Sequence, residues 1–128
     1  MKLVSISDYW WGKYQELCEY RKAPVPWPVR TCLFVAEGKE LVAGVLIYDT
    51  NGPHVFFEHL VTNETASLKA RHEAVWMMAE EMVRHCRTIG KIPHILVAHK
   101  GIERVLSRVG LKRSGAWSIT CTAEALSA

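Results

Sequence analysis

Hydrophobic and polar residues divide the first half of the chain into short apolar runs with turn-forming residues between them. The runs cover residues 31–36, 41–48 and 55–61, and each has the length of a β-strand. Neighbouring runs joined by short turns pair antiparallel, so the pattern predicts a three-stranded meander. The Asn51-Gly52 pair predicts a tight turn with positive φ angles before the third strand. The bulky residues of that strand predict burial on both of its faces.

The second half of the chain changes to a helical period. Apolar residues between positions 65 and 89 recur at helical intervals: Leu68, Val75, Met78, Ala79, Met82, Cys86 and Ile89. These intervals predict a helix of about 35 Å that crosses the sheet and ends at Gly90. We then expect a strand at 95–98, a short helix over 102–109 and one last strand at 117–122. A strand, helix, strand order predicts that the third strand and the 95–98 strand are parallel neighbours.

The N-terminal part adds a helix and a loop. Ser7 or Asp8 can cap a helix that runs to about Arg21. Three prolines within residues 23–28 exclude a helix or a central strand, so this segment is a loop that presents Trp27. A proline-rich ligand for an SH3-type domain is the alternative. No shift in composition marks a boundary, and residues 1–128 are therefore predicted to form one α/β (α+β) domain.

Composition and charge narrow the function classes. The 49% hydrophobic and 23% charged fractions are typical of a soluble protein, and a net charge of +3 is too small to predict nucleic-acid binding. No apolar run has the length of a membrane span, and the first residues lack a secretory signal, so we expect a cytoplasmic protein. Its four cysteines are then free thiols, with two disulfides in a secreted protein as the alternative. No cysteine or histidine spacing predicts a metal site.

The element order from residue 31 to residue 117, with its Val109-Gly110-Leu111 close, resembles the core of the GCN5-related N-acetyltransferase (GNAT) superfamily. The resemblance implies a GNAT-like mixed sheet in which an antiparallel meander precedes a β-α-β-α unit. The family ends in a two-strand hairpin, of which the pattern here predicts one strand, so we expect a C-terminal truncation. The implied activity is transfer of an acetyl group from acetyl-coenzyme A to a small-molecule or protein amine. That acceptor is expected near residues 24–28 and the Trp10-Trp11 pair.

The family holds the cofactor pyrophosphate with a Q/R-x-x-G-x-G/A motif, and the equivalent residues here are 65–70. Only Ala70 agrees with it, and the missing glycines leave the Leu68 and Lys69 side chains where the backbone should approach a phosphate. The helix start keeps its dipole, its hydroxyls and two cations, all of which favour a phosphate. A solvated first helical turn is the alternative. The cofactor residues that the resemblance implies are Val61, Thr62, Thr65, Ser67, Lys69, Ala70, Arg71 and His99.

Family members often carry a glutamate as general base on the strand before this loop, and Glu58 stands there. Desolvation in an apolar strand should raise the pKa of its carboxyl, as a base that acts on an ammonium group requires. A structural carboxylate is the alternative. The tyrosine that serves the family as acid falls on Leu106, so a coenzyme A thiolate would have to leave with the help of water.

The missing glycines and tyrosine favour a second hypothesis, a non-catalytic GNAT-fold binding or assembly protein without a cofactor site. Reduced GNAT-like proteins of this kind occur among tailed-phage proteins, some as virion components, and the chain resembles them. A virion location belongs to a phage-encoded protein of this kind, and a homo-oligomer is an expectation under either hypothesis. A small nucleic-acid-binding module has only the mild positive charge in its favour.

Overall fold

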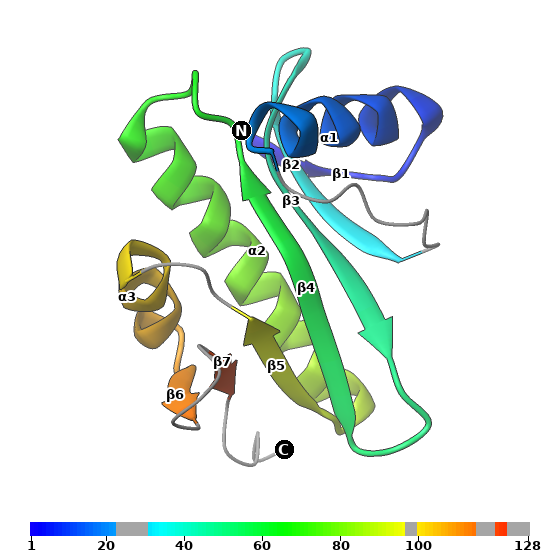
Figure 1. Cartoon of the computed structure of the whole chain (residues 1–128). Helices are drawn as coiled ribbons and strands as arrows, with labels where there is room; N and C mark the ends of the chain where they lie inside the picture. The colour runs from blue at the N-terminus through cyan, green and yellow to red at the C-terminus, as the bar shows by residue number, and fades with distance from the viewer. Residues whose placement is uncertain (23–30, 97–99, 115–119, 123–128) are drawn as a thin grey trace.

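The computed structural model describes residues 1–22, 31–96, 100–114 and 120–122. The elements in chain order are β1 (Lys2–Val4), α1 (Asp8–Tyr20), β2 (Cys32–Glu37), β3 (Glu40–Asp49), β4 (His54–Thr62), α2 (Leu68–Ile89), β5 (Ile92–Leu96), α3 (Lys100–Arg108), β6 (Lys112–Ser114) and β7 (Thr120–Thr122). The strands of these ranges form one sheet in the order β1-β2-β3-β4-β5-β7-β6 (Figure 1). The predicted α+β class is confirmed.

The centre of the sheet is the predicted one. Strands β2, β3 and β4 form an antiparallel meander, and β5 lies parallel to β4. Helix α2 connects the two parallel strands and crosses one face of the sheet, whereas α1 lies on the opposite face (Figure 1). Each face therefore has its own hydrophobic cluster. The α2 cluster includes Val45, Phe57, Met78 and Met82, and the α1 cluster is built from Tyr14, Cys18, Phe34, Leu41, Leu46 and Val61.

Both helices begin and end at residues whose side chains or backbone suit the position. The Ser7 hydroxyl accepts a hydrogen bond from the Trp10 amide at the start of α1. Ser67 caps α2, so this helix begins at Leu68 rather than at the predicted residue 65. Gly90 ends α2 with φ at 69°, in the left-handed region that a residue without a Cβ adopts most easily.

Strand β4 is not buried on both faces, and that prediction is wrong. Val55 and Phe57 are fully buried in the α2 cluster, whereas Phe56, on the opposite face, is 37% exposed. The reason is that α1 lies across only one end of its face of the sheet (Figure 1). Phe56, which points away from α2 in the part of β4 that α1 does not cover, therefore remains accessible, whereas Val61 is buried under α1.

The turn before β4 also differs from the prediction, because neither Asn51 nor Gly52 has a positive φ. The Thr50 hydroxyl organises this turn instead. It accepts a hydrogen bond from the Gly52 amide at 3.2 Å and donates one to the His54 carbonyl at 2.6 Å. A side chain thus replaces the special backbone angles that a two-residue turn would need.

The C-terminal part contains one strand more than the pattern predicts. Strand β7 pairs antiparallel with both β5 and β6, so the closing hairpin of the resembling family is present in a short form. Three-residue strands are too short to produce a recognisable alternation, and β1 was missed for the same reason. The predicted loop at 23–28, the end of the 95–98 strand and the start of the 117–122 strand lie outside the described residues.

Three thiols in the described ranges, those of Cys18, Cys32 and Cys86, are free, as predicted. Burial raises the pKa of the Cys32 and Cys86 thiols to about 11, so both are protonated at neutral pH. The described histidine, cysteine and acidic residues form no group of three that could hold a metal ion. None of the helices in these ranges combines the length and apolar character that crossing a bilayer requires.

Candidate functional site

A β-bulge interrupts β4 close to its carboxyl end. Between Glu58 and Val61, β4 contains one residue more than the strand β3 with which it pairs. His59 lies in the bulge with φ at 57°, which is unusual for a residue other than glycine. The hydroxyl of the buried Tyr14 donates a hydrogen bond to the His59 carbonyl at 2.5 Å. Helix α1 therefore holds the bulge in place through one side chain.

Among the described residues, the ladder between β4 and β5 ends before this bulge. Its last described pair is Phe57 with Ile95, whereas β4 continues to Thr62 in partnership with β3. Figure 1 shows β4 extending past the arrowhead of β5. In the described ranges, the backbone groups on this edge of β4 are not used by β5. Such an edge can pair with another extended chain through backbone hydrogen bonds.

Arg21, just after α1, fixes the end of β4. Its Nε donates to the Thr62 carbonyl at 3.1 Å, and Nη2 donates to the Thr62 hydroxyl at 2.7 Å. Its Nη1 reaches the Glu64 carboxylate at 2.7 Å. Thr62 was predicted as a cofactor residue, but its hydroxyl already accepts a hydrogen bond from this arginine. Arg21 was not predicted because the contact joins segments far apart in the sequence.

Asn63 organises the loop that follows. Its side-chain oxygen accepts hydrogen bonds from the Thr65 amide at 3.0 Å and from the Thr65 hydroxyl at 2.7 Å. Its side-chain amide donates to the Leu41 carbonyl at 3.0 Å. The Thr65 hydroxyl, another predicted cofactor group, is thus engaged within the loop. The loop takes a defined shape without glycine because the asparagine side chain closes the turn.

The first turns of α2 contain the predicted phosphate-binding groups. The Ser67 hydroxyl accepts a hydrogen bond from the Ala70 amide at 3.0 Å, so a phosphate would have to share or replace that bond. Leu68 is 60% exposed, and Lys69 is exposed as well. The Arg71 Nε is buried and has no hydrogen-bond partner among the described residues. A buried donor of this kind is costly to leave unpaired, and a phosphate oxygen would satisfy it.

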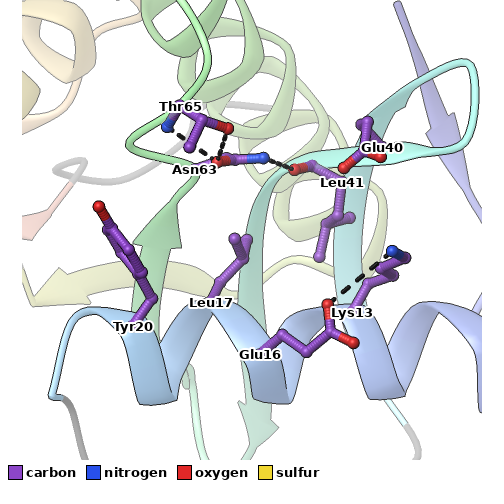
Figure 2. Close-up of a pocket in the computed structure, with 8 residues that line it drawn as sticks. All are labelled: Lys13, Glu16, Leu17, Tyr20, Glu40, Leu41, Asn63 and Thr65. Atoms are coloured by element: carbon purple, nitrogen blue, oxygen red, sulfur yellow. Dashed lines mark hydrogen bonds and ion pairs between the residues drawn. The ribbon is translucent and has the colours of Figure 1, made fainter.

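A cleft of about 200 Å³ lies between α1 and this loop (Figure 2). It is lined by Lys13, Glu16, Leu17, Tyr20, Glu40, Leu41, Asn63 and Thr65. The Leu17 and Leu41 side chains point into the space between the helix and β3, and Lys13 and Glu16 form an ion pair of 3.8 Å at one side. Thr65 is the one predicted site residue that this cleft contains.

A second cleft of about 350 Å³ lies between α2 and α3, one helical turn beyond Arg71. Its lining consists of His72, Glu73, Trp76, Met77, Val105 and Arg108. The aromatic face of Trp76 and the cation of Arg108 suit a flat, negatively charged group. The residue pattern alone did not predict this cleft, because its lining comes from two helices that lie far apart along the chain.

Glu58 is half-buried and lies on the α1 side of the sheet, opposite Leu46 of β3. The bulge begins directly after it, so Glu58 is close in sequence to the part of the β4 edge that has no partner among the described residues of β5. Of the other predicted residues, Val61 is buried in the α1 cluster and Ala70 packs against the α2 cluster. His99 lies outside the described residues. Leu106 and Leu111 are core residues. In the GNAT superfamily, which the chain resembles, a tyrosine acid and a phenylalanine hold the corresponding positions.

Neither a protein-family model nor a curated protein sequence matches the chain. Solved structures do match it. One is the crystal structure of the ribosomal-protein-S18-alanine N-acetyltransferase from Escherichia coli, with a TM-score of 0.69. The alignment covers 99% of this chain and 95% of that chain at 8% sequence identity. At this identity the match establishes the fold and leaves the residues of the site to be judged by their own geometry.

Proposed function

We propose, from the GCN5-related N-acetyltransferase fold of this chain, that it is an N-acyltransferase that moves an acetyl group from acetyl-coenzyme A to an amine. The observation that carries the proposal is the edge of β4 between Phe57 and Thr62. Among the described residues, this edge has no partner in β5 beyond Phe57; it adjoins a bulge held by Tyr14 and leads into the start of α2. A row of backbone groups without a partner in those ranges, next to a helix N-terminus, is what a long ligand with amides at one end and phosphates at the other requires.

The residues around this edge fit coenzyme A. Backbone groups of β4 up to Val61 and Thr62 would pair with the pantetheine amides. The Nε of Arg71, which has no partner among the described residues, would hold phosphate oxygens together with the Lys69 ammonium and the amides after Ser67. Trp76 and Arg108 of the α2–α3 cleft would take the nucleotide end. Thr65, Ala70 and His99 remain predicted contacts.

When bound, the cofactor supplies the acetyl thioester, and the chain must position the amine and handle its protons. Glu58 is the proposed general base: its carboxylate accepts a proton from the substrate ammonium, and the neutral amine can then attack the thioester carbonyl. Attack would form the amide carbon–nitrogen bond and break the thioester carbon–sulfur bond, leaving one surplus proton on the nitrogen and a thiolate as the leaving group. Leu106 stands where the family has its acid, so water would carry that proton from the nitrogen to the sulfur.

Calorimetric titration with acetyl-coenzyme A tests the cofactor site. We expect saturable binding that Arg71→Gln weakens by about 1–3 kcal/mol, because a charge-assisted hydrogen bond is lost. Arg87→Gln is the matched control, since it removes the same charge from the exposed last turn of α2. Equal affinity of the two variants would exclude Arg71 from the site.

Glu58→Gln tests the base. The change preserves shape and removes proton acceptance, so we expect turnover to fall roughly 10²–10⁴-fold with little change in cofactor affinity. Acetylation assays over a panel of amines, together with the titration above, separate the two quantities. An active wild type whose Glu58→Gln variant acetylates at the same rate would remove Glu58 from the mechanism.

A non-catalytic assembly protein, such as a phage component, is the second candidate. Two hydrogen bonds favour it: the Ala70 amide donates to the Ser67 hydroxyl, and Arg21 donates to the Thr62 hydroxyl. Both bonds occupy groups that a cofactor would use. A chain whose melting temperature does not change at millimolar acetyl-coenzyme A would support this candidate, since a ligand that binds the folded state must raise that temperature.

A further inference from the structure

Five aromatic and imidazole rings form a continuous strip on the α1 side of the sheet. The ring strip consists of Tyr48, His54, Phe56, His59 and His94, from strands β3, β4 and β5. The Phe56 and His94 rings are stacked with their centroids 5.0 Å apart, and His54 lies 4.7 Å from His94. Tyr48 pairs with Phe56 across the β3–β4 ladder and lies 6.4 Å from His59.

The strip lies where α1 leaves the sheet. Tyr48 touches the edge of the α1 cluster, whereas Phe56 is 37% exposed and His59 is exposed. An exposed phenylalanine in mid-strand presents apolar area that packing has not used. Stacking against His94 also fixes the Phe56 ring in one orientation, so it offers a flat, preorganised face.

Charge defines what this face can bind. The Nδ1 of His54 and the Nε2 of His94 are 2.6 Å apart, so one nitrogen donates a proton to the other. Burial, and then the neighbouring His54 ring, lower the pKa of His94, which keeps this pair from carrying two charges. Glu58 lies on the same face as Phe56, two residues along β4 or roughly 7 Å away. A carboxylate beside ring faces is complementary to a cation attached to a flat group.

We propose that the ring strip and Glu58 bind a primary amine joined by a short linker to an aromatic ring, as the acceptor of the proposed acetyl transfer. The ammonium group pairs with the Glu58 carboxylate, and the aromatic group stacks on Phe56 and His94. The role of this amine as acetyl acceptor rests on the proposed function, whereas its binding to the ring strip needs no cofactor. A second copy of the chain fits less well, because a symmetric face-to-face contact would bring two Glu58 carboxylates into one interface.

Three probes separate the contributions of charge and ring: phenethylamine, cyclohexylethylamine and phenethyl alcohol. Binding is measured on the full chain by NMR titration without acetyl-coenzyme A. We expect phenethylamine to bind about 2- to 5-fold more tightly than cyclohexylethylamine, which matches its charge and size without the aromatic face. Phenethyl alcohol, which lacks the charge, should bind roughly 10- to 100-fold more weakly.

Variants locate the binding. Phe56→Leu should remove the preference for the aromatic amine, and Glu58→Gln should remove the preference for amine over alcohol. Tyr9→Leu, at a ring on α1 that is 50% exposed, is the control and should leave both preferences intact. Equal affinity of the wild type for phenethylamine and cyclohexylethylamine would overturn the inference. It would also be overturned if the wild type binds no amine but forms a dimer that the Phe56→Leu change dissociates.

The outcome also separates this inference from the proposed function. If acetyl-coenzyme A does not bind and the aromatic preference is present, the amine site stands and the transferase proposal fails. If acetyl-coenzyme A binds and both amines are acetylated with equal kcat/KM, the transferase stands and the ring strip has no role in specificity.

Discussion

At the scale of single residues, Gly44 decides how α1 reaches the bulge. A Cβ built on Gly44 would lie 2.7 Å from the Tyr14 Cδ2 and 2.9 Å from the Phe34 Cδ1. Both rings are fully buried, so neither has room to retreat. The absence of a side chain on β3 thus allows Tyr14 to lie flat on the sheet and donate its hydrogen bond to His59.

Gly44→Ala should therefore lower the free energy of unfolding by about 1–3 kcal/mol, the usual effect of overpacking a core. Gly12→Ala is the control, because a Cβ on Gly12 would meet nothing within 4 Å and alanine favours a helix interior. We expect that change to stabilise the protein by roughly 0.5–1 kcal/mol. Urea denaturation of both variants measures the difference, and a neutral Gly44→Ala would contradict the packing described here.

His94 should make stability depend on pH. Its pKa is lowered in the folded state, first by burial and then by His54, from the ordinary value of 6.5. The unfolded chain therefore binds the proton more readily than the folded chain. The contribution of His94 to the free energy of unfolding is fully present above pH 6.5 and is lost as the pH falls below that value. His94→Gln should reduce this slope in denaturation curves recorded at several pH values, whereas His85→Gln, at an exposed histidine of α2, should not. Equal slopes would contradict the prediction.

At the scale of elements, the start of α2 is stabilised by the chain itself. Ser67 caps the Ala70 amide, and Asn63 closes the preceding turn. These bonds explain how a helix start without glycines keeps a defined shape. A phosphate would have to displace these bonds, so the groups that stabilise the helix start are also the groups that would bind the cofactor.

Ser67→Ala should cost about 1 kcal/mol of unfolding free energy, the usual value of a lost helix cap. Ser107→Ala, whose hydroxyl bonds the Arg104 carbonyl inside α3, is the control and should change stability by less than roughly 0.5 kcal/mol. Thermal or urea unfolding gives both values. If phosphate competes with the Ser67 hydroxyl, acetyl-coenzyme A should bind the Ser67→Ala variant at least as tightly as the wild type, and weaker binding would show that the hydroxyl assists it.

At the scale of the whole molecule, the two faces of the sheet differ in how far a helix covers them. The face under α2 is closed by a long apolar helix, and its residues serve the core. The other face is closed by α1 at one end only, which leaves the ring strip and Glu58 accessible. The edge of β4 borders both faces, so a cofactor on that edge, as proposed, would lie next to an amine on the ring strip.

The sequence by itself determined the central strands, the long helix and their order. The alternating runs predicted the meander, and the seven apolar positions between 65 and 89 predicted the long helix, because residue periodicity reports directly on which face is buried. The resemblance to the acetyltransferase fold depended on this order, and the structural match confirms it. The same resemblance predicted Glu58 as the base and placed most of the predicted cofactor residues in the 61–71 segment.

Only the tertiary structure decided how the site is made. The Tyr14 hydroxyl holds the bulge at His59, and Arg21 binds Thr62, so both contacts join distant parts of the chain. The packing of the fold also leaves the Arg71 Nε buried without a partner among the described residues. The ring strip likewise combines residues from three strands. The alternation along one strand predicts which face a side chain lies on, but not which residues of the other strands lie beside it. Local patterns report burial along one segment, whereas a site depends on register between segments, and register is set by the packing of the whole sheet.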